Sequence, residues 1–267
     1  ANSLFVWGDN SVGQLGDYTT TNKLVPAPVK PVSWVYVAKG VNFSAAIRND
    51  GLLFTWGTNS AGQLGDGTVV QRSSPVQIGN SSWSAVSCGG THTVALLSDS
   101  TAWSWGAGTS GAQGQNDAVS RSSPTQIGTG SWLQVIASRV NNFSLGIRSD
   151  RTLYSWGVNS SGQLGTGDVA QLSSPTQVGT STWIQIAAGS CTAAIRSDGA
   201  LFTAGLNTSG QLGDGTTTQQ TSFVKLTSWG TTVKGVYPIG SQFAFTFFQK
   251  GDNSIWATGR NASGQLG

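Results

Sequence analysis

The residues of this chain that could carry chemistry recur at regular spacing. A Gly-Gln-Leu-Gly motif returns about every fifty residues. Its first glycine stands at Gly13, Gly62, Gly162, Gly210 and Gly264, with a degenerate copy at Gly111. Glycine-rich loops bind phosphate where their backbone N–H groups precede a helix or a lysine, and neither directly follows this motif. Because the motif returns in every unit, whereas an active site would not, we expect a structural role. Its leucine would pack between units, and its glutamine amide would bond to buried backbone groups.

The residues best suited to bind metals or to act as nucleophiles are isolated. His92 is the only histidine, and no Cys or Asp lies at metal-ligand spacing from it. It aligns with Phe43, Phe143 and Cys191 of other units, which indicates a packing position. Cys88 stands among small, core-like residues, and we expect both cysteines to be free, because they lie in non-adjacent units.

Paired carboxylates, which acid–base catalysis needs, are not indicated either. Glutamate is absent, and several aspartates occupy equivalent turns. These are Asp50, Asp99, Asp150 and Asp198. Glycoside hydrolases hold two carboxyl groups about 5–10 Å apart in one cleft, whereas equivalent turns of separate units stay apart. No Ser–His–Asp set with a nucleophile elbow is visible. We therefore predict that the protein is not an enzyme and uses no metal and no cofactor.

The composition excludes further classes of function. Only 9% of the residues are charged, against roughly 25% in an average soluble domain. The lysines and arginines give a net charge of +3 but form no run, whereas nucleic-acid-binding proteins gather them on one face. No window approaches about 18 consecutive apolar residues. We therefore predict no nucleic acid, no membrane span and a protein partner rather than a small molecule. The absence of methionine leads us to expect a processed chain or a piece of a longer one.

The elements that must position these residues are short strands. In the unit that begins at Trp83, the patterns place strands at 83–87, 92–97, 102–105 and 123–127. Asp50-Gly51 is a strong signal for a hairpin turn, and Pro124 marks its strand as an edge strand. Four antiparallel strands per unit make one blade of a ring. We expect the tryptophans that end the third strands to be mostly buried; these are Trp7, Trp56, Trp105 and Trp156.

The stretch from Leu53 to Thr68, which reads LFTWGTNSAGQLGDGT, recurs throughout the chain. It resembles the repeat of the regulator of chromosome condensation family, in which about fifty residues form one propeller blade. The resemblance implies an all-β fold, a single β-propeller domain over residues 1–267. Six units are represented, or seven if the ring is completed by chain not present here. Their approximate bounds are 1–33 (partial), 34–82, 83–131, 132–182, 183–228 and 229–267 (partial).

Little chemistry is left once the repeated positions are assigned to the fold, so we predict a non-enzymatic protein-interaction or structural module. Binding residues tend to lie on loops held by a rigid scaffold. The stretches that depart most from the repeat are 17–30, 113–121, 139–142 and 231–242. The candidate partner-binding residues in them are Tyr18, Lys23, Gln115, Asn116, Arg139 and Tyr237.

The low charge and the abundance of Ser, Thr, Gly and Asn favour an extracellular or virion-surface assembly over the cytoplasm. The resemblance also implies an alternative, an intracellular regulator of the small-GTPase exchange or chromatin-docking type. An enzyme with its site on one degenerate blade is the alternative from another class.

Overall fold

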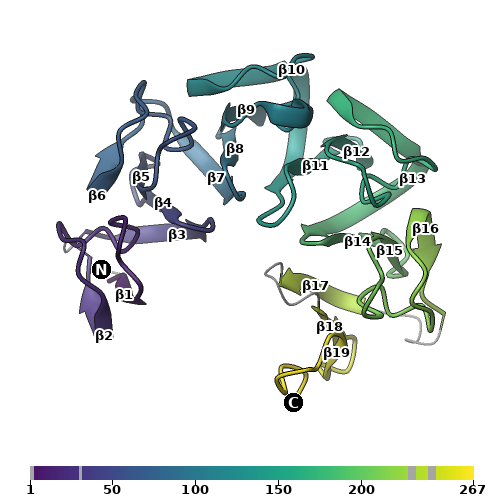
Figure 1. Cartoon of the computed structure of the whole chain (residues 1–267). Coiled ribbons are helices and arrows are strands. Elements are labelled where there is room, and N and C mark those ends of the chain that lie inside the picture. Colours follow the sequence, from purple (N-terminus) through teal and green to yellow (C-terminus); the bar gives the residue numbers. More distant parts are fainter. Residues whose placement is uncertain (1–2, 30–31, 228–232, 240–244) are drawn as a thin grey trace.

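The chain folds into antiparallel sheets arranged around a ring (Figure 1). The computed structural model describes residues 3–29, 32–227, 233–239 and 245–267. Strands take up roughly half of the chain, well above the 20–25% of an average domain. The one helical element among the described residues is a 3-10 turn, η1 (Thr109–Gly111). The predicted all-β propeller is therefore confirmed.

Four sheets are complete blades, each with four strands in chain order from the centre of the ring outward. The first consists of β3 (Trp34–Lys39), β4 (Phe43–Arg48), β5 (Leu53–Gly57) and β6 (Arg72–Gln77). The second consists of β7 (Trp83–Cys88), β8 (His92–Leu97), β9 (Thr101–Gly106) and the start of β10 (Arg121–Ala137). The third consists of the end of β10, β11 (Phe143–Arg148), β12 (Thr152–Gly157) and the start of β13 (Leu172–Ala188). The fourth consists of the end of β13, β14 (Cys191–Arg196), β15 (Leu201–Gly205) and β16 (Gln220–Lys225).

Two incomplete sheets stand at the two ends of the open ring (Figure 1). The N-terminal one contains β1 (Phe5–Gly8) and β2 (Lys23–Pro28), which correspond to the third and fourth strands of a blade. The C-terminal one contains β17 (Val233–Ile239), β18 (Phe245–Lys250) and β19 (Ile255–Gly259), which correspond to the first three. The blade number of a closed ring stays a prediction.

Local sequence signals account for the ends of the strands. Gly51 has a φ of 83° in the turn between β4 and β5, a conformation that glycine adopts without steric cost. Pro75 lies in the outermost strand β6, where the pairing with β5 is irregular and passes from Val76 to Arg72. A residue without an N–H is tolerated there because no ladder bond is lost.

The core lies between neighbouring blades. Trp56, Trp105 and Trp156 are fully buried, as predicted. The indole of Trp56 lies against the Gly-Gln-Leu-Gly loop of the preceding unit and donates a hydrogen bond to the carbonyl oxygen of Gln14 (3.0 Å). The prediction was wrong for Trp7, whose side chain is 62% exposed. Among the described residues no preceding unit covers it, so most of its surface stays exposed.

Candidate functional site on the loop face

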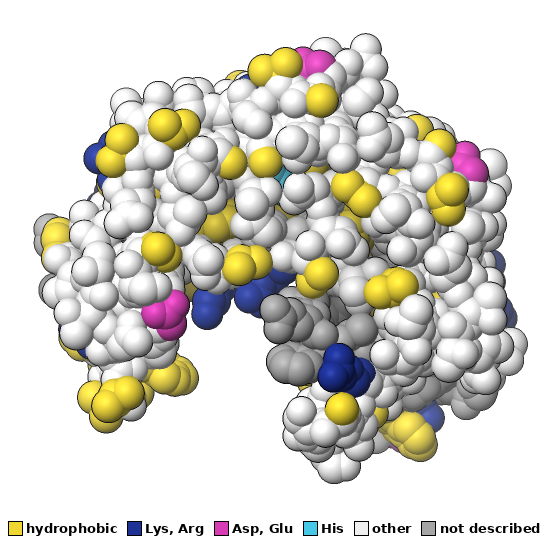
Figure 2. Space-filling model, in the orientation of Figure 1, with side chains coloured by type: hydrophobic (Ala, Val, Ile, Leu, Met, Phe, Trp, Pro, Cys, Tyr) yellow, Lys and Arg dark blue, Asp and Glu magenta, His cyan; other side chains and the backbone are white. Residues whose placement is uncertain are grey.

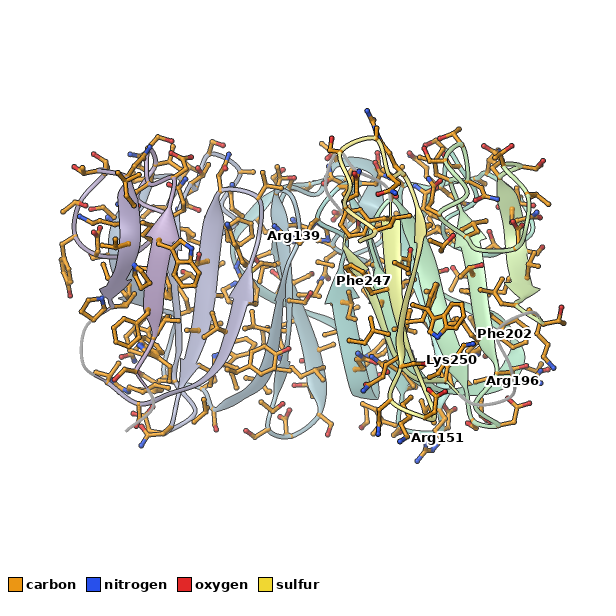
Figure 3. The ribbon with its side chains drawn as sticks, turned by 90° about the horizontal axis from the view of Figure 1, so that it is seen from below. Arg139, Arg151, Arg196, Phe202, Phe247 and Lys250 are labelled. Atoms are coloured by element: carbon orange, nitrogen blue, oxygen red, sulfur yellow. The ribbon has the colours of Figure 1, made fainter. Side chains whose placement is uncertain are left out.

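The ring has two faces that differ in the connections they carry. We call the loop face the one with the connections from first to second strand (40–42, 89–91, 138–142, 189–190) and from third to fourth strand (9–22, 58–71, 107–120, 158–171, 206–219). We call the turn face the one with the tight turns from second to third strand (49–52, 98–100, 149–151, 197–200). In the edge-on view of Figure 3, Arg139 lies toward the first and Arg151 toward the second.

A buried asparagine organises the long connection of most blades. The Oδ1 atom of Asn59 accepts a hydrogen bond from the backbone N–H of Leu64 (2.9 Å). Its Nδ2 donates to the carbonyl oxygens of Thr68 and Val70 and to a carboxylate oxygen of Asp66. The same pattern is formed by Asn10, Asn159 and Asn207. The loop is therefore rigid before any partner binds.

The glutamine of the motif has the structural role that the sequence predicted. The Oε1 atom of Gln63 accepts a hydrogen bond from the backbone N–H of Ala61 (2.8 Å). The carbonyl oxygen of Gln63 accepts two more, from the indole of Trp105 and the hydroxyl of Thr93 in the next blade. Leu64 is fully buried. The motif thus joins each blade to the next, and its side chains are not available to a ligand.

Two of the predicted partner-binding residues, Tyr18 and Asn116, stand at the tip of this connection. Their φ angles are 69° and 61°, in the left-handed region. Each donates its backbone N–H to the fourth strand of the next blade, to Ser73 and Ser173 respectively (2.8 Å each). The same position is held by Gly67, Gly167 and Gly215 in the other blades. The side chain of Tyr18 is 54% exposed and stands at the edge of the loop face.

Lys23, also predicted as a binding residue, is paired within its own unit. Its Nζ lies 2.9 Å from a carboxylate oxygen of Asp17, and the side chain of Asp17 is largely buried. Arg72 forms the equivalent ion pair with Asp66 in the next unit, at 2.7 Å. Lys23 therefore contributes to closing the loop that carries Tyr18.

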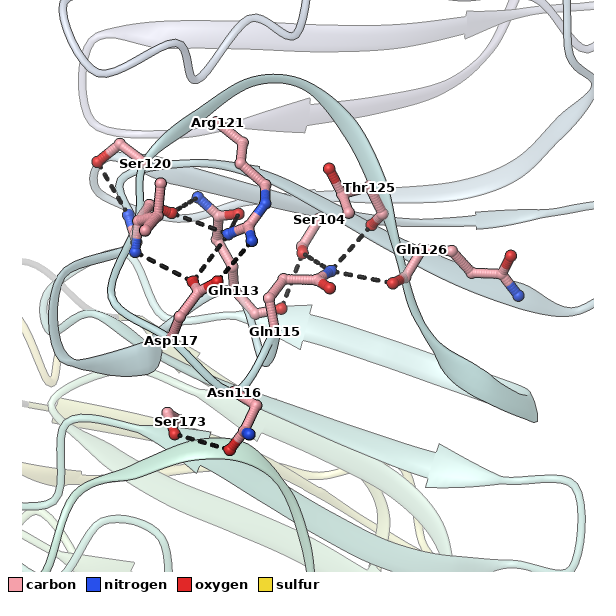
Figure 4. Close-up of polar contacts among 12 residues, drawn as sticks. Ser104, Gln113, Gln115, Asn116, Asp117, Ser120, Arg121, Thr125, Gln126 and Ser173 are labelled. Atoms are coloured by element: carbon pink, nitrogen blue, oxygen red, sulfur yellow. Dashed lines mark hydrogen bonds and ion pairs between the residues drawn. The ribbon is translucent and has the colours of Figure 1, made fainter.

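Gln115 lies in the degenerate connection, where Gly108 stands at the position of the organising asparagine. A Cβ atom on Gly108 would lie only 2.1 Å from the carbonyl oxygen of Val119, so no asparagine fits there. The Nε2 atom of Gln113 replaces it and donates to the carbonyl oxygens of Val119 and Gly106. This connection keeps its shape with a different set of hydrogen bonds (Figure 4).

The Nε2 atom of Gln115 donates to the hydroxyl of Ser104 (3.2 Å) and to the carbonyl oxygens of Thr125 and Gln126. An ion pair between Arg121 and Asp117 closes the other side, and hydrogen bonding from Arg121 lowers the pKa of Asp117 to about 2. The amide of Gln115 is thus directed into the blade, while Asn116 stays at its surface.

Arg139 lies at the inner edge of the loop face, on a connection two residues longer than its equivalent between β3 and β4. Its Nη2 donates to the carbonyl oxygen of Gly40, two blades away (3.3 Å). It reaches there across Gly90, where a Cβ atom would lie 3.1 Å from the carbonyl oxygen of Arg139. Arg139 and Lys39 line a central cavity of about 370 Å³, and Figure 2 shows Lys and Arg side chains at the inner edge of the ring.

The sixth predicted residue, Tyr237, lies on β17 opposite Phe247. Its side chain lies outside the described residues, as does part of the stretch 231–242. The structure thus spreads Tyr18, Lys23, Gln115, Asn116 and Arg139 over three units of the ring, with Tyr18 and Lys23 in one and Gln115 and Asn116 in another, and it does not bring them into one cluster.

Burial shifts the pKa values of the one histidine and the two cysteines toward their neutral forms. The Nε2 atom of His92 lies 2.9 Å from the hydroxyl of Ser144, and burial lowers the histidine pKa to about 4. Cys88 and Cys191 are free and buried, and burial raises the pKa of Cys191 to about 11. The described part of the chain contains no group of three or more His, Cys, Asp or Glu residues placed to hold a metal ion. No helix in that part is long and apolar enough to span a membrane.

Comparison with known proteins identifies the family of these repeats. A family model described as the regulator of chromosome condensation (RCC1) repeat matches residues 2–47, 50–96 and 150–195, and a second model with that description matches residues 83–112. Together they cover more than half of the chain. No curated protein sequence matches it.

Several solved structures are similar in fold. Human WBSCR16 is 24% identical, with a TM-score of 0.84 over 97% of this chain and 74% of that chain. Yeast RCC1 (Prp20), solved with Kap60, is 20% identical, with a TM-score of 0.83 over 97% of this chain and 66% of that chain. Prp20p from Saccharomyces cerevisiae is 20% identical, with a TM-score of 0.82 over 96% and 67%. The chain thus spans about two thirds to three quarters of these structures, and the likeness shows their fold.

Proposed function

Because the chain belongs to the regulator of chromosome condensation repeat family, we propose that it is a protein-interaction module without enzymatic activity, which presents its loop face to a partner protein. The observation that carries this proposal is the backbone of Tyr18. A left-handed conformation costs a residue other than glycine about 1–2 kcal/mol, and the equivalent Gly67, Gly167 and Gly215 avoid that cost.

Strain of this kind persists where function requires the side chain. Tyrosine is enriched among the residues that contribute most to binding energy at protein interfaces. Tyr18 stands exposed at the tip of a loop that Asn10 and the Lys23–Asp17 ion pair hold in place. A rigid loop with an exposed aromatic side chain is suited to binding because little conformational entropy is lost on association.

The structural neighbours support a partner that is itself a protein. Yeast RCC1 (Prp20) is described in a complex with Kap60, and Prp20p is described with binding properties to Gsp1p and histones. These descriptions favour, as the second candidate function, an intracellular regulator of the exchange or chromatin-docking type. The charge content of only 9% and the abundance of small polar residues support instead the extracellular or virion-surface setting, which we retain as part of the proposal.

The test is site-specific photo-crosslinking in the organism that supplies the chain. A photoreactive residue is placed at Tyr18 or Arg139 and, as matched controls, at Gly167 and Gly215, which hold the position of Tyr18 in other blades. We expect one protein to be captured from Tyr18 or Arg139 and not from the two controls. Purified partner should then bind Tyr18→Gly at least about tenfold more weakly, a loss of about 1.4 kcal/mol. Equal capture from all four positions, or unchanged binding, would refute the assignment of the loop face.

A further inference from the structure

A hollow of about 440 Å³ opens between the third and fourth complete blades on the turn face. Leu133 and Ile184 form its rim and are 54% and 46% exposed. The buried Trp183 lies beneath them, and Arg151 stands beside them. Two large apolar side chains are therefore held at the surface around a concave site with one cation.

The other junctions between blades lack this combination. The residue after the first tryptophan of each blade is Val35, Ser84, Leu133 or Ile184, and Lys234 holds this position on β17. The turn residue equivalent to Arg151 is glycine, serine or asparagine elsewhere, at Gly51, Ser100, Gly199 and Asn253. Among the described blades, only this junction joins two large apolar residues to an arginine.

The backbone of Arg151 adopts a conformation that glycine adopts at the equivalent turn of the first and fourth complete blades. Its φ is 68°, in the left-handed region. Its carbonyl oxygen accepts the backbone N–H of Trp183 (2.9 Å), as the carbonyl oxygen of Gly51 accepts that of Trp83 (2.8 Å). The fold therefore needs no side chain here, and an arginine at this position carries a conformational cost for no structural gain.

The charge of Arg151 is open to a ligand. In two equivalent turns, the arginines at the position of Arg148, which are Arg48 and Arg196, pair with Asp50 and Asp198. Within the described residues Arg151 makes no ion pair, and its side chain is exposed at the edge of the turn face (Figure 3).

The charged groups of this turn leave one positive charge in excess. Asp150 supplies the one negative charge; it accepts hydrogen bonds from the hydroxyl and the backbone N–H of Thr152 and interacts with the charge of Arg148. Arg148 stacks on the rings of Trp132 and Tyr154, at 4.9 and 4.5 Å from their centres, and adds a second positive charge nearby.

Hydrogen bonds of the Gln134 and Gln185 side chains hold the floor of the hollow in place. The Oε1 atom of Gln134 accepts the backbone N–H of Ile186 (3.1 Å), and the Nε2 atom of Gln185 donates to the carbonyl oxygen of Val236 (3.2 Å). Both amides join the innermost strands of neighbouring blades. The hollow keeps its shape without a ligand, so little would have to be ordered on binding.

We propose that this hollow is a second docking site, which binds an acidic segment of a partner protein by placing an apolar side chain against Leu133 and Ile184 and a carboxylate on Arg151. The guanidinium offers the paired donors that a carboxylate accepts, and the apolar rim gives the burial that a surface ion pair alone does not provide. The site lies on the face opposite to the one in the proposed function and does not depend on it.

The probe is a short acetylated and amidated peptide of alternating aspartate and leucine, titrated into the protein with labelled methyl groups. We expect the methyl resonances of Leu133 and Ile184 to shift in a saturable way and those of Val35 to stay unchanged. A peptide with lysine in place of aspartate, or serine in place of leucine, should not bind. Arg151→Gly should weaken binding about tenfold, the effect of losing about 1.4 kcal/mol, and should not lower stability, because it restores the residue found at Gly51 and Gly199.

Leu133→Ser, which copies the natural Ser84, should also weaken binding and separates the apolar contribution from the charged one. If Arg151→Gly binds the peptide as tightly as the parent protein, or if Val35 shifts as much as Leu133, the docking site is disproved. Arg151→Gly should leave the partner of the loop face bound, so failure of this proposal and failure of the proposed function are separate results.

Discussion

The ring of Phe223 in β16 lies 5.4 Å from that of Trp183 in β13, in the space that a third-strand tryptophan fills in the other complete blades. There, Trp56, Trp105 and Trp156 lie 5.7–6.1 Å from the first-strand tryptophans Trp34, Trp83 and Trp132. In the fourth blade the third strand has Ala204 at that position. Phe223 replaces the missing ring from the neighbouring strand, where the other blades have proline.

This exchange predicts a measurable coupling between positions 204 and 223. Phe223→Ala removes a partly buried ring that packs against the core and should lower the free energy of unfolding, by less than the about 3–5 kcal/mol of a fully buried aromatic ring. Ala204→Trp alone would overfill the same space and should cost about 1–3 kcal/mol. The double variant Ala204→Trp with Phe223→Pro rebuilds the arrangement of the other blades, because the strand pairing passes over residue 223 as it does over Pro75.

Urea unfolding of Ala204→Trp, of Phe223→Pro and of the double variant that combines them measures this coupling. The double variant should be more stable than the sum of its two single variants predicts, by at least about 1 kcal/mol. Additive effects would show that the two positions do not share one space.

A second prediction compares two tryptophans that the sequence makes equivalent. Trp56→Ala should destabilise by about 3–5 kcal/mol, since it removes a buried ring and leaves the carbonyl oxygen of Gln14 without the indole donor. Trp7→Ala, the matched control at an exposed position, should change stability by less than about 1 kcal/mol. Thermal or chemical unfolding measures the two stability losses, and equal losses would mean that Trp7 is covered in solution.

Repetition explains how much of the fold was predictable from the sequence. The strands, the turn at Gly51 and the packing position of His92 follow from local patterns that each unit repeats. The exposure of Trp7 did not follow, because burial at that position is supplied by the preceding unit rather than by its own. The role of Asn59 was missed although a signal exists: an asparagine stands three residues before the motif in most units.

The candidate sites were less predictable, because they depend on how separate blades meet. Departure from the repeat directed attention to Tyr18 and Asn116, which the structure places at the loop tips. It did not predict that Gln115 is directed inward. The acceptors of its amide are carbonyl oxygens of the fourth strand, and the repeat pattern does not show how the loop lies against that strand. The hollow beside Arg151 requires Leu133 and Ile184 from two different blades, and no local pattern places them together.

His92 predicts a pH dependence of stability. Burial lowers its pKa in the folded protein from 6.5 to about 4, whereas the unfolded chain keeps the ordinary value. Between these values the unfolded state binds more protons, so the free energy of unfolding falls as the pH falls from about 6.5 to about 4. The loss over this window is on the order of 3 kcal/mol.

His92→Phe, which copies Phe43 and Phe143 at the equivalent position, should remove this dependence and stay folded at neutral pH. Ser144 retains its hydrogen bond to the carbonyl oxygen of Ala112 in that variant. Denaturant midpoints at several pH values test the prediction. An unchanged slope between about pH 6.5 and 4 in His92→Phe would assign the effect to other groups.

The strained backbone of Tyr18 predicts that replacing this residue by glycine raises stability, while the proposed function expects the same change to weaken partner binding. Tyr18→Gly should raise the free energy of unfolding by about 1 kcal/mol, because glycine adopts the φ of 69° without the steric cost that tyrosine has. Tyr18→Ala keeps the Cβ atom and the strain, so it should show no gain in stability over the parent protein. Asn116→Gly is the matched control in another blade, and it should gain less, since asparagine tolerates this conformation better than other residues. Calorimetry of the three variants ranks these effects. A loss of stability in Tyr18→Gly would mean that the ring itself stabilises the loop, and the strain at Tyr18 would then need no functional explanation.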